Sequence, residues 1–349
     1  MSEATNRPTT TQSTIVMTSA DMQRTMLDVA MDTTSSSPQL TTSISSTASF
    51  PTSPEGSTTP TTLGSTLPAH FTAPAGALAI VADEYTGKFW KITSTEEEWL
   101  SFETVLIDMT VDERDGNVFW TEQGGTRIWR CDIGSNTKET LFEGSNTPPR
   151  EVAFDGQDRA LYFSHILENN GFGFAISFIH VDNSESGRND FVLLTSLVRA
   201  LVIDEQRFAY WTDNDGLKCK HLSGTGSTET IDATLGNLPT TLSIDPTIAN
   251  RVYLTTVNKV YLWEFSTGAW RKTDLSAYIG THPANTQGTT QVNFLFFFNS
   301  VLYVQAGNGI GVIHNLDRNP IDHSEITVEY LALIGPQSPV ALYVKSLFP

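Results

Sequence analysis

Four aspartates stand at the ends of four similar apolar segments, where they could act together as metal ligands. They are Asp112, Asp155, Asp204 and Asp245, and each follows a short apolar stretch such as Val152–Phe154. If these segments are equivalent strands of a ring, their ends converge, and carboxylate oxygens are the ligands that calcium prefers. The alternative is structural, because an aspartate at a strand end can cap the following turn by accepting backbone N–H groups. Repetition of the aspartate in each segment favours the structural interpretation.

Other residue types that carry chemistry in enzymes form no catalytic set in this sequence. The seven histidines are scattered, without the spacing of a zinc site. No nucleophile elbow, phosphate-binding loop or dinucleotide-binding turn occurs in its required context. His165 stands at the mouth of a long turn, residues 166–173, where we expect either an ordinary surface histidine or a pH-sensitive partner contact. We therefore expect no catalytic residue, no bound metal and no cofactor.

These residues belong to a strand pattern that recurs six times between about residue 77 and the end of the sequence. The best copy reads Ala-Tyr-Trp-Thr-Asp at residues 209–213, and the copies follow one another at steps of 39 to 50 residues. Repeats of this length, built from short strands and polar turns, predict a β-propeller with four antiparallel strands per blade. The aligned Thr-like positions are Ala82, Thr121, Ser164, Thr212, Thr255 and Gln305.

The two ends of the repeat region complement each other. The first unit begins with its second strand, residues 78–83, and the last segment, residues 339–344, has the pattern of the missing inner strand. Pairing of these two segments would close the ring and leave no exposed sheet edge. We therefore predict an all-β fold, a six-bladed β-propeller with a C-terminal closing strand.

The sequence before the repeats has a different composition. More than half of residues 33–67 are serine or threonine, with several prolines and almost no charge. Such low complexity is typical of a disordered, mucin-like stalk, because large apolar groups are too few to offset the entropy of ordering the chain. The sequence therefore predicts a disordered Ser/Thr/Pro-rich segment over residues 1–75 and a propeller over residues 76–349.

The repeats also resemble those of a known family. An inner strand that ends in aspartate, the sequence Tyr-Trp-Thr-Asp at residues 210–213 and the alternating strand that follows resemble the YWTD, or class B, repeat of the low-density lipoprotein receptor family. The resemblance covers about residues 77–349, and the copy at residues 118–122 matches nearly as well. It implies a six-bladed propeller that binds other proteins as a receptor-like or matrix-like platform. The family's cysteine-rich modules are not found in this sequence, so only this general binding role is carried over.

Composition limits the class of partner and the setting. The net charge is −18 and no basic block occurs, which argues against a nucleic-acid partner and leaves a protein partner. Apolar runs such as residues 294–298 are too short to insert in a membrane, and the N-terminus has no apolar signal core. The resemblance and the stalk favour an extracellular or cell-surface location. We expect Cys131 and Cys219, the two cysteines, to be free thiols.

Binding surfaces on propellers gather the loops that precede the inner strands and those that follow the second strands. Arg150 and Arg199 stand out among them, because a cation near the axis of an acidic chain can orient an acidic group of a partner. The alternative function is a calcium-dependent, lactonase-type hydrolase on a six-bladed propeller, with Glu151 and Asn293 as the first candidate ligands. The predicted partner-binding residues are Glu122, Arg150, Glu151, His165, Arg199, Asp215, Asn258, Gln291 and Gln337.

Overall fold

Six four-stranded antiparallel sheets make up the described part of the chain. The computed structural model describes residues 73, 77–83, 87–93, 95–102, 104–144, 148–167, 173–183, 187–224, 226–235, 239–245, 248, 250–256, 259–276, 295–298, 301–306, 309–314, 316, 327–332 and 339–346. The strands, grouped by sheet from the inner strand outwards, are β24 (Pro339–Ser346), β1 (Ala77–Asp83), β2 (Lys88–Ile92) and β3 (Glu96–Ser101); β4 (Leu106–Asp112), β5 (Asn117–Glu122), β6 (Arg127–Asp132) and β7 (Glu139–Glu143); β8 (Pro149–Asp155), β9 (Ala160–Ile166), β10 (Phe174–His180) and β11 (Asn189–Leu194); β12 (Ala200–Ile203), β13 (Phe208–Asp213), β14 (Gly216–His221) and β15 (Glu229–Asp232); β16 (Pro239–Ile244), β17 (Arg251–Thr256), β18 (Lys259–Ser266) and β19 (Ala269–Asp274); β20 (Leu295–Phe298), β21 (Val301–Ala306), β22 (Gly309–His314) and β23 (Thr327–Ala332).

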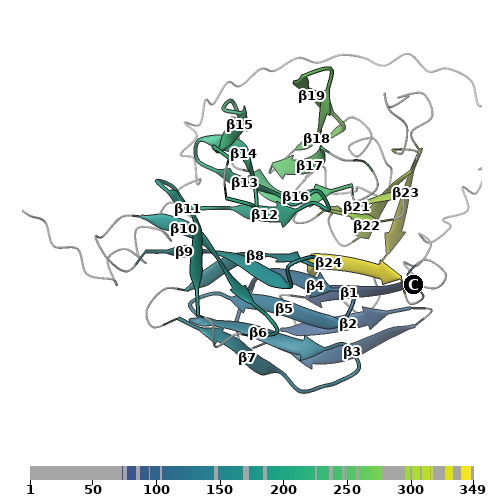
Figure 1. Ribbon diagram of the computed structural model, residues 1–349. Helices are drawn as coiled ribbons and strands as arrows, with labels where there is room; N and C mark the ends of the chain where they lie inside the picture. The colour runs from purple at the N-terminus through teal and green to yellow at the C-terminus, as the bar shows by residue number, and fades with distance from the viewer. Residues whose placement is uncertain are drawn as a thin grey trace, which may run out of the picture. The chain divides into compact units, whose positions relative to one another are not determined.

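The inner strands form a closed ring. Each contacts the next in the order β24, β4, β8, β12, β16 and β20, and β20 contacts β24 again. Strand β24, the last in the chain, pairs antiparallel with β1, with Ile80 opposite Tyr343, and the two lie side by side in Figure 1. The predicted six-bladed propeller with its C-terminal closing strand is therefore confirmed. We number the blades from the first (β24 and β1–β3) to the sixth (β20–β23).

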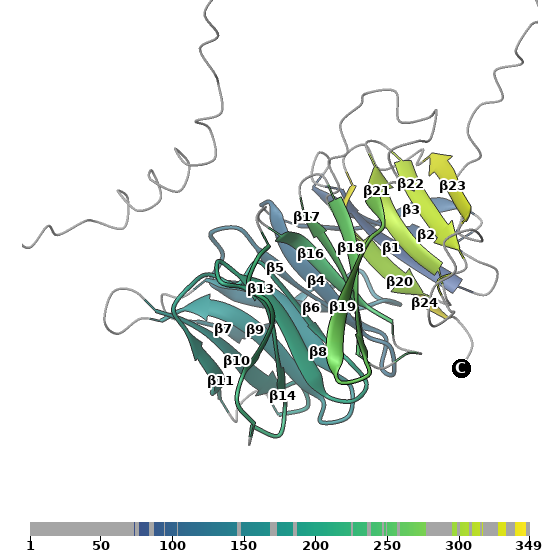
Figure 2. The same cartoon turned by 90° about the horizontal axis from the view of Figure 1, so that it is seen from above.

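Hydrophobic side chains fill each contact between neighbouring blades. Six buried clusters lie among the described residues, and each draws on two adjacent blades. The first and sixth blades, which lie side by side in Figure 2, share one of them. In β13, Trp211 packs towards the third blade and Tyr210 towards the fifth. Because successive side chains of a strand point to opposite faces, the paired aromatic residues of the repeat serve two interfaces at once.

The prediction that both cysteines are free thiols is confirmed. Cys131 and Cys219 are free and buried. Each belongs to one of the clusters between blades, where a thiol packs as a small apolar group. Burial raises the pKa of Cys219 to about 12, and nearby Glu229 and Asp204 act in the same direction. This side chain therefore stays a thiol at neutral pH and is a poor nucleophile.

Residues 1–75, where the sequence predicts a stalk, lie outside the described residues apart from Ala73. The backbone N–H of Ala73 donates to the carbonyl of Thr93, next to β2. The predicted domain boundary near residue 75 stays a prediction. In the part of the chain that the structure describes, no helix is long and apolar enough to cross a membrane.

Gly216, at the start of β14, is expected to tolerate no side chain. Its φ is +122°, and a Cβ atom there would lie 1.9 Å from the backbone oxygen of Asp232 in the paired strand β15. Gly224 is a matched control, since it also has a positive φ (+73°) but has open space around the Cβ position. We expect Gly216→Ala to lower the unfolding free energy by about 2 kcal/mol or more, and Gly224→Ala by about 1 kcal/mol. Denaturant titration of both variants tests this, and equal losses would contradict it.

Candidate protein-binding site

The ring of inner strands has two faces with different chemistry. We call the face where the inner strands begin, at Leu106, Pro149 and Ala200, the start face. The opposite face, where they end near Asp112 and Asp155, is the end face. The aspartates considered as metal ligands therefore lie on one face, and Arg150 and Arg199 lie on the other.

Aspartates on the end face cap turns. Asp112 Oδ1 accepts the backbone N–H of Arg114 at 3.2 Å, and Asp155 Oδ1 accepts that of Gln157 at 3.0 Å. Asp204 Oδ1 accepts the backbone N–H of Phe208 at 2.7 Å. The structural interpretation is confirmed for these three aspartates, because their oxygens hold the chain between the first and second strands of their blades. Asp245 Oδ2 lies 3.5 Å from Arg251 Nη1 of its own blade.

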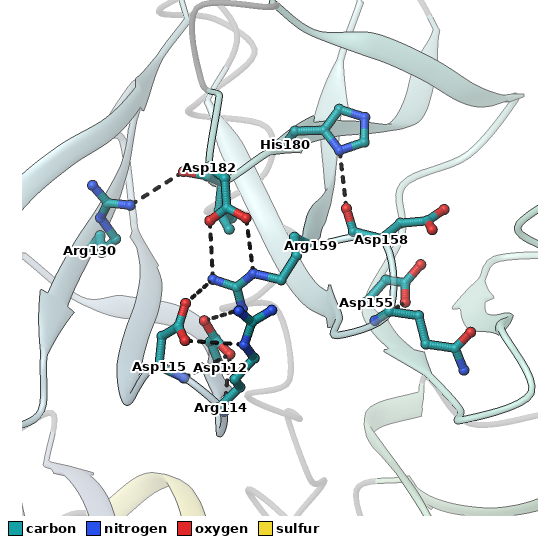
Figure 3. A network of polar contacts seen from close by, with 11 residues as sticks. Asp112, Arg114, Asp115, Arg130, Asp155, Asp158, Arg159, His180 and Asp182 are labelled. Atoms are coloured by element: carbon teal, nitrogen blue, oxygen red, sulfur yellow. Dashed lines mark hydrogen bonds and ion pairs between the residues drawn. The ribbon is translucent and has the colours of Figure 1, made fainter.

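Arginines from the following blade bind the second oxygens of two of these aspartates. Arg159 Nη1, in the third blade, donates to Asp112 Oδ2 in the second blade at 2.5 Å. Figure 3 shows the same guanidinium between Asp112, Asp115 and Asp182. Arg207, in the fourth blade, donates from Nε to Asp155 Oδ2 in the third at 3.2 Å. On the end face, these carboxylates link neighbouring blades through arginine.

The start face carries a cavity built by three successive blades. Its volume is about 340 Å³, within the range of sites that hold a small ligand or a side chain of a partner. Arg150 and Glu151 come from β8, and Arg199 directly precedes β12. The structure thus brings together three residues of the predicted partner-binding set. The cavity is lined by Leu106, Ile107, Gln123, Arg150, Glu151 and Arg199.

Irregular pairing at the beginnings of the inner strands explains why consecutive residues share this cavity. The register of β8 against β9 shifts between Pro149 and Val152, where Arg150 and Glu151 lie. The register of β4 against β5 shifts likewise between Leu106 and Asp108. A β-bulge re-aims side chains that would otherwise alternate between the two faces of a sheet. The bulged segment is held by Thr-like residues of the repeat, since Thr121 Oγ1 donates to the carbonyl of Arg150 and Ser164 Oγ accepts the N–H of Glu151 at 3.2 Å.

Two guanidinium groups lie close together in this cavity and are incompletely bonded. Burial lowers the pKa of Arg199, and the positive charge of Arg150 lowers it further. Arg199 Nη2 donates to Asn214 Oδ1 in a long contact of 3.4 Å. Among the described residues, the buried Nε atoms of Arg150 and Arg199 have no hydrogen-bond partner. An anion in the cavity would relieve the repulsion and satisfy these donors.

Glu151 lies beside the arginines, and a second carboxyl group, that of Asp108, is its neighbour. Asp108, on β4, accepts backbone N–H groups from Met109 at 2.8 Å and from Val152 at 2.9 Å, which places it against the strand that carries Glu151. Burial raises the pKa of Asp108 to about 7, although these two hydrogen bonds lower it. Burial also raises the pKa of Glu151, and repulsion from Asp108 raises it further against the opposing effect of Arg150 and Arg199.

Comparison with known proteins was made with the sequence and with the fold. No family model and no curated protein matches the sequence. The fold matches a chain of the crystal structure of a nidogen/laminin complex, with a TM-score of 0.60 and 15% identity over 77% of this chain and 98% of that one. The fold is that of the nidogen propeller. Because the YWTD repeat builds that propeller, the predicted resemblance is confirmed at the level of the fold.

Asp215 and Glu122 of the predicted partner-binding set do not line the cavity. Asp215 is exposed in the turn between β13 and β14 and pairs with Lys218 at 3.3 Å. Glu122 is buried and accepts from Trp120 Nε1 at 3.0 Å within its own strand. Asn258, Gln291 and Gln337, together with Asn293 of the alternative function, lie outside the described residues.

The expected surface position of His165 is wrong. Its side chain is buried, with Nε2 at 2.8 Å from Ser177 Oγ and Nδ1 at 2.9 Å from the carbonyl of Ile166. Ser177 Oγ in turn donates to Asp190 Oδ1 at 2.7 Å. The sequence pattern placed His165 at a strand end next to a long turn. In the structure, its imidazole is buried and contacts Ser177 on β10, which in turn donates to Asp190 on β11.

Sequence reasoning missed Asp108, the carboxyl group next to Glu151. This residue lies in the middle of an apolar segment and does not align with the repeated aspartates at the strand ends. The only signal was a charged residue within a predicted buried strand, which requires a special environment. That environment comes from β8, a neighbour in space from the next blade.

Proposed function

We propose that residues 76–349 form a non-enzymatic, extracellular protein-binding module whose start face receives an acidic side chain of a partner protein. The observation that carries this proposal is the pair of close, incompletely bonded guanidiniums of Arg150 and Arg199 in one cavity. Arginine binds carboxylates through several hydrogen bonds at once, which gives both affinity and orientation. A protein partner is further supported by the likeness to a propeller from a nidogen/laminin complex.

The overall charge of the chain narrows the chemistry of the partner. A net charge of −18 repels a uniformly acidic surface and attracts a basic one. The arginine cavity, in contrast, requires one negative charge on the partner where it enters the cavity. The partner that fits both conditions presents one aspartate or glutamate, or a chain-terminal carboxylate, within neutral or basic surroundings.

The calcium-dependent hydrolase is the weaker alternative because of the same two arginines. Glu151, its first candidate ligand, lies in the cavity with Arg150 and Arg199. Two positive charges in the same cavity oppose the binding of a divalent cation, whereas they favour an anion. On the end face, Asp112 and Asp155 hold arginine donors at the oxygens that a cation would need.

A peptide with a single carboxylate tests the proposed function. The probe is a fluorescent, blocked peptide with one aspartate flanked by serines and arginines, and its control carries asparagine instead. We expect the aspartate peptide to bind more tightly than the asparagine peptide, and Arg150→Gln and Arg199→Gln each to weaken its binding about tenfold, as for a lost charged hydrogen bond. Fluorescence anisotropy gives the dissociation constants.

A control variant separates the cavity from general charge effects. Arg114→Gln removes one positive charge from the end face, where the side chain is 73% exposed. This variant should bind the aspartate peptide as the parent protein does. Equal affinity for the two peptides, or equal loss in all three arginine variants, would show that the cavity is not a carboxylate site.

A further inference from the structure

Arg150, Arg199 and Glu151 line the arginine cavity, and Asp108 lies next to Glu151. Arg150 and Glu151 follow one another in the bulged start of β8, and Arg199 lies before β12. Asp108 is held from β4 by two backbone donors, one of which is the N–H of Val152, the residue after Glu151. Three blades therefore hold these four groups together, so a change in the charge of one acts directly on the others.

The protonation state of the two carboxyls decides the charge of the cavity. With both carboxyls ionised, the four groups sum to zero charge, and each bound proton adds one positive charge. Burial of both carboxyls and the repulsion between them favour the protonated forms. Of the described neighbours, Gln123 is neutral, and Glu122 on β5 is engaged with the indole of Trp120. Arg150 and Arg199 are the cations that act on Glu151.

We propose that Asp108 and Glu151 form a proton-dependent switch for the arginine cavity, which binds a partner's carboxylate while the pair retains a proton and releases it when that proton is lost. The switch rests on the proposed function and adds its regulation. The protonated pair leaves the guanidiniums free for the carboxylate of the partner. The fully ionised pair neutralises them and repels an incoming carboxylate.

Linkage fixes the expected pH dependence. A ligand that binds the protonated form takes up a proton wherever the free cavity has lost it, so its dissociation constant rises by up to about tenfold per pH unit for each linked proton. The pKa of Asp108 is raised to about 7, and the pKa of Glu151 is also raised. The increase of the dissociation constant is therefore expected above pH 7. Binding of the peptide is therefore expected to weaken as the pH increases. Arginine flanks keep the charge of the probe peptide constant over this range.

The test measures affinity for the aspartate peptide between pH 7 and 9 in the full chain and in Glu151→Gln. The parent protein should bind more weakly at each step towards pH 9. In Glu151→Gln the amide cannot ionise, so one linked proton is lost, and the dissociation constant should rise less steeply with pH and be lower than that of the parent at pH 9. Asp158→Asn, at a half-exposed carboxylate of the end face, should keep the parent's slope.

Stability gives a second readout that does not depend on the peptide. An acid whose pKa is raised in the folded state binds more protons there than in the unfolded chain, so it destabilises the fold increasingly as pH rises towards the folded pKa. The melting temperature of Glu151→Gln should therefore exceed that of the parent by a margin that grows between pH 6 and 9. A margin that is the same at every pH would mean that Glu151 has only a packing role and would overturn the switch.

Failure of the switch is distinguishable from failure of the proposed function. If Arg150→Gln and Arg199→Gln lose binding but Glu151→Gln keeps the parent's pH slope, the cavity binds carboxylates and the switch is wrong. If the arginine variants bind as the parent does, the proposed function itself is wrong. A pH-independent dissociation constant in the parent protein between pH 7 and 9 would also overturn the switch.

Discussion

Replacing Arg159 with alanine is expected to lower the unfolding free energy of the propeller by about 3 kcal/mol. The guanidinium is only 11% exposed and binds Asp112, whose side chain is 1% exposed, across the boundary between the second and third blades. Its removal leaves a buried carboxylate without its cation, which typically costs about 3–5 kcal/mol. We expect the lower end of this range, because Asp112 keeps the backbone donors of Arg114 and Asp115.

The backbone at Arg159 allows a sharper version of this experiment. Its φ is +54°, a left-handed conformation that costs a residue with a side chain about 1 kcal/mol relative to glycine. Gly116 occupies the same place in the turn of the second blade, with a φ of +70°. Arg159→Gly should therefore be about 1 kcal/mol more stable than Arg159→Ala, and still less stable than the parent.

Denaturant titration of these variants requires an arginine control. Arg127 forms an exposed pair with Glu143 at 3.0 Å, with side chains 44% and 54% exposed. Arg127→Ala should change stability by no more than about 0.5 kcal/mol, as is usual for surface pairs. If Arg159→Ala costs as little as Arg127→Ala, the contact with Asp112 does not link the blades energetically.

Deleting residues 338–349 is expected to abolish cooperative unfolding. The deletion removes β24, which pairs with β1 along its whole length and completes the ring between β20 and β4. Ile80, Val81 and Ala82 of β1 are fully buried, and loss of the neighbouring strand would expose their backbone groups at a new sheet edge. Differential scanning calorimetry and circular dichroism should show a broad transition or none.

A shorter deletion provides the control for the closing strand. Residues 347–349 follow β24, so their removal leaves the pairing with β1 intact. This variant should melt cooperatively, close to the temperature of the parent. If deletion of residues 338–349 gave the same melting curve, β24 would not be needed to hold the ring closed.

Much of the fold could be predicted from the sequence because the physical requirements of a blade repeat along the chain. Each unit needs an apolar second strand packed on both sides, and the aromatic pair at Tyr210 and Trp211 has this property in the best copy. The missing inner strand at one end and the extra strand at the other predicted closure, which the pairing of β1 with β24 confirms. Local pattern and global architecture agree here, so sequence reasoning was sufficient.

The candidate site was predictable only in part. Arg150, Glu151 and Arg199 follow from their place before inner strands, and the structure brings all three to one cavity. Asp108 could not be found in this way, since its contact with β8 depends on a bulge and on the approach of two blades. His165 was misplaced for a similar reason, because strand periodicity does not reveal that its ring reaches Ser177.

The sequence by itself therefore determined the number of blades, the closing strand and the turn-capping role of Asp112, Asp155 and Asp204, since each depends on a short-range pattern repeated along the chain. Only the tertiary structure decided which charged groups meet. Arg159 reaches Asp112 in the preceding blade, and Asp108 reaches the strand that carries Glu151 in the following one. Such contacts join residues 44 to 47 positions apart. Their partners are fixed by the approach of neighbouring blades and by local bulges, which no periodicity of the sequence encodes.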